Sequence, residues 1–213
     1  MKHCIFALFL FGALLHASTV DVTLLNAGNG AIDSTGRYYV GPYNLTINGV
    51  VTPAMCMDDF VEDNLEDRWS ANVTAANSSD FSSTYLGNGG ETLNGEFYTS
   101  AQIYNAEAYL FSLIIKPGAD QADIQEAAWL IMDSSNPTYA SNAGVQSYFL
   151  AATDNAKSFN SSGFSIISDV NKFGAQEFMV TSPTPEPSTV VLLGTGLVAF
   201  GAARLRRRKQ SKA

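Results

Sequence analysis

An uncharged apolar run near the end of the chain constrains what the chain can fold into more than any other stretch. The run covers residues 190–203, follows the proline-rich segment 183–188 and precedes a basic cluster. Counted from Thr189, the run would span about 22 Å as a helix. This is shorter than a bilayer core of about 30 Å, so the flanking polar side chains would have to extend to the membrane interfaces. Arginines hold their end of such a helix in the cytoplasm. We therefore expect a linker at 181–188, a transmembrane helix at 189–203 and a cytoplasmic tail at 204–213. The basic residues expected to retain this end at the membrane are Arg204, Arg206, Arg207, Arg208 and Lys209.

The linker carries the triplet Pro185, Glu186 and Pro187 directly before the apolar run. Together the three parts of the tail resemble the PEP-CTERM sorting signal of Gram-negative bacteria, a motif also labelled an ice-binding-protein C-terminal domain. The resemblance implies processing by exosortase, a membrane protease-transpeptidase, and transient anchoring before the body reaches the cell surface or the exterior. An ordinary membrane anchor with a proline-rich stalk is the alternative, and it also places the body outside the cytoplasm.

The other end of the chain has the features of a secretory signal peptide. Lys2 and His3 precede the apolar run 5–15, and a cleavage site after Ala17 would start the mature chain near Ser18. We therefore expect a signal peptide at 1–17 and an exported domain at 18–180.

The exported domain has a composition that excludes several kinds of chemistry. It contains 5 basic and 19 acidic residues, a net charge of −14, which disfavours nucleic acid and anionic lipid as partners. Both histidines, His3 and His16, lie in the signal peptide, so histidine-dependent catalysis and histidine metal sites are excluded. Cys56 is the one cysteine of the domain, and no disulfide can form within it.

The hydrophobic pattern predicts strands, then helices, then strands. Asn48 and Gly49 form a strong hairpin signal because both tolerate positive φ, whereas 72–95 is rich in small polar residues and predicts a long excursion or irregular strands. This order indicates an α+β domain, mainly antiparallel β and sandwich-like, with a helical insertion near 100–156. The expected strands are 19–26, 37–40, 43–47, 50–57, 163–170 and 173–181, and the expected helices are 100–115, 120–133 and 142–156.

Cys56 and Gln125 form the most specific candidate site. Cys56 ends a predicted strand, and Gln125 opens a predicted helix in an apolar-Gln-x-x-apolar-aromatic pattern ending at Trp129. The pair is similar to that of thioester domains from bacterial surface adhesins, in which a cysteine thiol and a glutamine carboxamide lose ammonia and form an internal thioester. The alternatives are that Cys56 is a small apolar core residue and that Gln125 is a solvated helix residue.

Other features suggest weaker possibilities. The acidic segment 58–67 could bind Ca²⁺ or present a solvated face, and it lacks EF-hand spacing. Pairs of carboxylates leave a glycosidase open, and the tyrosines and Trp69 could stack on sugars or lie in the core. We expect a non-enzymatic protein of the cell surface or matrix, without cofactor, metal or catalytic residues. Its expected partners are exosortase, the membrane and, by resemblance, biofilm exopolysaccharide. A thioester adhesin and a carboxylate-dependent glycosidase are the alternatives.

Overall fold

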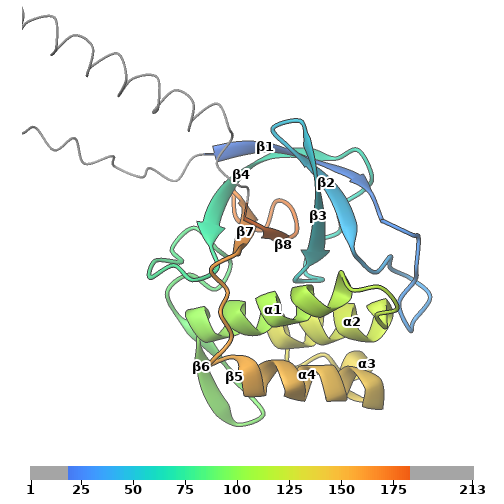
Figure 1. Ribbon diagram of the computed structural model, residues 1–213, viewed down its shortest axis with the longest axis vertical. Helices are drawn as coiled ribbons and strands as arrows, with labels where there is room; N and C mark the ends of the chain where they lie inside the picture. Colours follow the sequence, from blue (N-terminus) through green and yellow to red (C-terminus); the bar gives the residue numbers. More distant parts are fainter. Residues whose placement is uncertain (1–18, 183–213) are drawn as a thin grey trace, which may run out of the picture. The chain divides into compact units, whose positions relative to one another are not determined.

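A computed structural model describes residues 19–182, and the contacts of the chain divide it after Thr181. The predicted signal peptide, the Pro-Glu-Pro triplet, the transmembrane helix and the basic tail lie outside the described residues. Six strands form a closed antiparallel barrel in the order β1-β2-β3-β8-β7-β4 (Figure 1). The barrel strands are β1 (Thr19–Asn26), β2 (Tyr43–Ile47), β3 (Val50–Cys56), β4 (Arg68–Ala75), β7 (Phe164–Asp169) and β8 (Phe178–Thr181).

The closed barrel corrects the expectation of a sandwich-like sheet. β1 pairs with β2 on one side and with β4 on the other, while β3 pairs with β8 and β7 joins β8 to β4. Each barrel strand therefore has two neighbours, and the closure removes the exposed edges that a sandwich would keep. The prediction of an α+β domain that is mainly antiparallel β is confirmed.

Four helices and a small hairpin make up the rest of the described chain. α1 and α2 lie next to the barrel, and α4 packs on both of them (Figure 1). The sequence predicted the three longer helices, and Thr99, Asp120 and Asn142 cap them with their side chains. These elements are α1 (Ser100–Ile114), α2 (Gln121–Met132), α3 (Pro137–Ala140), α4 (Ala143–Asn155), β5 (Gly90–Leu93) and β6 (Glu96–Thr99).

Local side-chain hydrogen bonds explain where strand predictions were wrong. Residues 37–40 form no strand: the backbone N–H groups of Arg37 and Tyr38 donate to the Asp33 carboxylate at 2.8 and 3.0 Å. Only an isolated bridge between Ile32 and Tyr39 remains there. The Asp33 carboxylate therefore accepts the backbone N–H groups that a strand at 37–40 would donate to a neighbouring strand.

Two other stretches also differ from the predicted pattern. Residues 76–89 form neither helix nor strand, in agreement with the excursion expected at 72–95, whereas the strands β4, β5 and β6 were not predicted. The last strand is shorter than predicted, since Lys172 and Phe173 adopt positive φ angles of 38° and 60° and the chain turns before β8. The Asn48–Gly49 turn is confirmed, with φ angles of 49° and 81°.

β3 connects the exposed side of the barrel to its helix-covered side. Val50 and Val51 are exposed, whereas 54–57 are fully buried, and the end of the strand reaches α1 and α2 (Figure 1). The last residues of β3 therefore lie between the barrel and the helical layer. Within residues 19–182, no helix has both the length and the apolar character needed to cross a membrane.

Candidate functional site

Cys56 lies at the buried end of β3. Its side chain is fully buried, and the thiol donates to the backbone carbonyl of Asp58 at 2.9 Å. Burial, reinforced by the nearby Asp58 charge, raises the pKa of the Cys56 thiol well above its usual value, and the indole of Trp129 partly opposes this rise. The thiol is therefore protonated at neutral pH, and within residues 19–182 it has no disulfide partner.

Gln125 is also fully buried, in the second turn of α2. Every residue from Ile124 to Met132 is buried, because α2 packs against the barrel on one side and against α4 on another. The prediction that Gln125 is a solvated helix residue is therefore wrong. The predicted apolar positions 124, 127, 128 and 131 are buried as expected, but the helix buries its polar positions as well.

The fold brings Cys56 and Gln125 together. The Gln125 carboxamide nitrogen donates to the backbone carbonyl of Cys56, and its oxygen accepts from the Gly41 N–H at 3.4 Å. The two residues are 69 positions apart in the chain, so only the packing of α2 on the end of β3 makes them neighbours. The hydrogen bond joins the Gln125 carboxamide to the Cys56 backbone, so the strand end and the start of the helix lie side by side, as a thioester between the two side chains would require.

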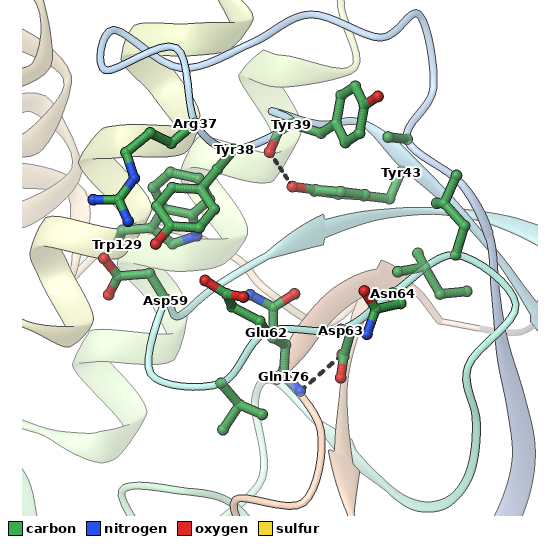
Figure 2. Close-up of a pocket in the computed structure, with 14 residues that line it drawn as sticks. Arg37, Tyr38, Tyr39, Tyr43, Asp59, Glu62, Asp63, Asn64, Trp129 and Gln176 are labelled. Carbon is green, nitrogen blue, oxygen red and sulfur yellow. Dashed lines mark hydrogen bonds between the residues drawn. The ribbon is translucent and has the colours of Figure 1, made fainter.

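A pocket of about 500 Å³ opens beside this pair. Figure 2 shows Tyr38, Tyr39, Tyr43 and Trp129 lining it together with carboxylates of the 59–63 segment. Its lining residues are Leu24, Ala27, Arg37, Tyr38, Tyr39, Tyr43, Asp59, Val61, Glu62, Asp63, Asn64, Leu65, Trp129 and Gln176.

Tyr43 and Trp129 line the pocket and also lie near the buried pair. A side chain at Gly41 would meet both the Gln125 carboxamide oxygen, at 3.1 Å, and the Tyr43 ring, at 3.3 Å. Trp129 follows Gln125 by one helical turn, and its indole lies close enough to Cys56 to lower the pKa of the thiol. Two lining residues of the pocket therefore lie near the Cys56–Gln125 pair.

The carboxylates of the acidic segment 58–67 lie in different surroundings. Asp58 is fully buried and accepts backbone N–H groups of Glu177 and Phe60 at 2.7 and 3.2 Å, whereas Asp67 accepts from the Asn64 N–H at 2.7 Å. Asp58 and Asp67 therefore brace the backbone. Among the described residues, no three carboxylate, cysteine or histidine groups are placed to hold a metal ion.

Asp59 and Asp63 face the pocket. Asp63 accepts from the Gln176 N–H at 2.9 Å, and Asp59 accepts from the Asn136 carboxamide at 3.3 Å. Partial burial raises the pKa of both carboxyl groups, that of Asp63 to about 6.

Two further buried carboxyl groups, Glu107 and Glu177, were missed by the sequence reasoning. Glu177 accepts from the Ser168 hydroxyl at 2.5 Å, the Tyr104 hydroxyl at 2.8 Å and the Tyr85 N–H at 2.9 Å. Burial raises its pKa to about 7, although these donors oppose the rise. Glu107 is fully buried, and neither of its oxygens has a hydrogen-bond partner.

A sequence signal for Glu107 was available. Glu107 lies four residues after Ile103 and four before Phe111, on the apolar face of α1, where all three residues are buried. Trp69, a candidate for sugar stacking, lies instead against Phe178 with ring centroids 6.0 Å apart and does not line the pocket.

Comparison with protein families gives a match to the PEP-CTERM protein-sorting motif at residues 183–208. The chain carries a PEP-CTERM sorting motif. The matched residues include Pro185, Glu186 and Pro187, and they confirm the resemblance inferred from the tail. Such a motif marks an exported protein that exosortase, a membrane enzyme, processes for the cell surface or the exterior. Comparison with curated proteins and with solved structures found no match.

Proposed function

We propose that this exported protein is a non-enzymatic surface protein whose body attaches covalently to its target through a thioester between Cys56 and Gln125. One observation carries the proposal: the Gln125 carboxamide donates to the backbone carbonyl of Cys56 although the two residues lie on different elements, and both side chains are fully buried. Burial protects an acyl thioester from water until a nucleophile reaches it.

The bond would form by displacement at the carboxamide. The Cys56 sulfur attacks the Gln125 side-chain carbonyl carbon, the carbon–nitrogen bond breaks, and the thiol proton leaves with the nitrogen as ammonia. The Gly41 N–H already donates to the oxygen that gains negative charge during this step, an arrangement that stabilises such charge. The product is an acyl group that an amine or a hydroxyl can capture.

The intact mass of the purified exported body tests the proposal. A linked body should be about 17 Da lighter than its sequence, because ammonia has left. Cys56→Ala and Gln125→Ala should each abolish the deficit. Gln146→Ala is the matched control, since the Gln146 side chain on α4 makes no hydrogen bond within the described residues, and it should retain the deficit.

The target remains a proposal that rests on the tail. Proteins with a PEP-CTERM tail are processed by exosortase on their way to the cell surface. The resemblance of this tail to theirs favours an exopolysaccharide of the biofilm matrix as the target. Its hydroxyl and amine groups are nucleophiles of the kind a thioester accepts.

A carboxylate-dependent glycosidase is the second candidate, because Asp59, Glu62 and Asp63 line a single pocket. The raised pKa of Asp63, about 6, suits a general acid. Turnover of an oligosaccharide, lost on changing Asp63 to Asn, would support this candidate against the thioester.

A further inference from the structure

The pocket has a rigid aromatic wall. The Tyr38 ring packs edge-on against Trp129 with centroids 6.1 Å apart, and Trp129 lies 5.5 Å from Tyr139. The Tyr43 hydroxyl donates to the backbone carbonyl of Tyr39, and the Tyr43 ring packs edge-on against Phe178 at 5.9 Å. These contacts fix the rings before any ligand arrives, which lowers the entropy cost of binding.

The carboxylates of the pocket are not neutralised by the protein. Asp59, Glu62 and Asp63 face one guanidinium, that of Arg37, which lies over the Tyr38 ring at 5.5 Å from its centroid. Across residues 19–182, the ion pair that forms is Lys157–Glu96, away from the pocket. Glu62 is exposed and makes no hydrogen bond within this part of the chain. The pocket therefore carries an excess of negative charge.

We propose that this pocket binds an organic cation, a protonated amine carried by the target of the protein. Carboxylates attract an ammonium group by charge, and the faces of Trp and Tyr rings stabilise a cation within about 6 Å. A neutral sugar could stack on the same rings, but it would leave the three carboxylates with Arg37 as their counter-charge within the lining. The net charge of −14 on the exported body favours the approach of a cationic target as well.

The position of the pocket adds a reason for an amine. Tyr43 and Trp129 line the pocket and also lie near Cys56 and Gln125, so an amine bound there is close to the proposed thioester. After losing one proton to water, the amine nitrogen would attack the Gln125 acyl carbon and the carbon–sulfur bond would break. The second proton of the nitrogen would pass to the departing sulfur, which leaves as the Cys56 thiol. Only this covalent step rests on the proposed function. Reversible binding of the cation does not.

Calorimetry on the Cys56→Ala body tests the binding without any thioester. Residues 19–182 contain their own closed barrel and core, and the chain divides after Thr181, so the exported body is a suitable sample. The probes are 1,5-diaminopentane and 1,5-pentanediol, which have the same carbon chain and differ in charge. We expect saturable binding of the diamine that weakens with salt, and no saturable binding of the diol.

Variants locate the binding. Glu62→Gln should weaken diamine binding about 5–10-fold through loss of one nearby charge. Asp63→Asn, which keeps an acceptor for the Gln176 N–H, should do the same. Asp154→Asn removes an exposed carboxylate of α4 that makes no side-chain hydrogen bond, and it should leave the affinity unchanged.

Three results would overturn the proposal: equal binding of the diol, unchanged diamine affinity in both pocket variants, or preferential binding of a neutral hexasaccharide. The last result would assign the pocket to a saccharide. Because the sample lacks Cys56, each outcome is independent of the mass deficit that tests the thioester.

Discussion

At the scale of single residues, two buried glutamates show how hydrogen-bond donors determine whether a buried carboxyl group stabilises the fold. Glu177 receives hydrogen bonds from Ser168, Tyr104 and Tyr85, whereas both oxygens of Glu107 have none. Burial, together with the nearby charges of Glu177 and Asp58, raises the pKa of Glu107 well above its usual value. The sequence reasoning could not separate these two residues, because hydrogen-bond donors from distant segments determine the difference.

Replacing each glutamate should therefore have opposite effects on stability. Glu107→Leu removes an unpartnered buried carboxyl and should raise the free energy of unfolding by about 1–3 kcal/mol at pH 7.5. Glu177→Leu leaves three buried donors without an acceptor and should lower it by about 2–5 kcal/mol. Urea unfolding of both variants checks the contrast, and a loss of stability in Glu107→Leu would contradict it.

The free energy of unfolding should also depend on pH, in a direction that the raised pKa of these carboxyl groups determines. A carboxyl group whose pKa is raised on folding keeps its proton longer in the folded state, so the unfolded state is favoured as pH rises. For Glu177 the window runs from its usual pKa of 4.5 to about 7 in the folded protein. The free energy of unfolding should fall across this window, and the fall should be smaller in Glu107→Leu.

At the scale of elements, α2 carries Gln125 and Trp129 and depends on a side-chain cap. Asp120 accepts from the Asp123 N–H at 3.4 Å, as the sequence predicted for this helix start. Local signals of this kind, with the Asn48–Gly49 turn, were sufficient to place α1, α2, α4 and the β2–β3 hairpin. They could not reveal that α2 would be buried on all sides from Ile124 to Met132, since that depends on the barrel and α4 packing on different sides of it.

Removing the cap should loosen the helix turn that leads to Gln125. Asp120→Ala should lower the free energy of unfolding by about 1 kcal/mol, whereas Asp120→Asn should change it little because asparagine also caps. If the position of Gln125 on α2 governs bond formation, the linked fraction measured by mass should be lower in Asp120→Ala. An equal linked fraction in both variants would show that the Asp120 cap does not influence formation of the thioester.

At the scale of the whole molecule, the body and the tail were predictable to different degrees. The sorting motif of the tail can be recognised from local sequence, and the match at 183–208 confirms that motif. The barrel depends on pairings such as Ala54–Val180 and Ala71–Asp169, between residues about a hundred positions apart, and no local pattern specifies them. The sequence could therefore give antiparallel strands with a helical insertion, but not their closure.

Processing of the tail is the prediction that belongs to this scale. In a host with the cognate exosortase, the surface form should lack residues 204–213, with cleavage near Pro187. Glu186→Ala should slow release, because a carboxylate within the Pro-Glu-Pro triplet would be lost. Mass spectrometry of the surface or secreted protein checks this, and a surface form that retains 204–213 would contradict processing.

The intact mass of the exported body tests the central claim most directly. The Cys56–Gln125 thioester predicts a deficit of about 17 Da, resistance of the thiol to alkylation, and recovery of a free thiol after treatment with a small amine. Cys56→Ala and Gln125→Ala should have their full sequence masses. A wild-type body with its full sequence mass and an alkylatable Cys56 after unfolding would contradict the thioester and leave the pair as a buried hydrogen-bonded contact.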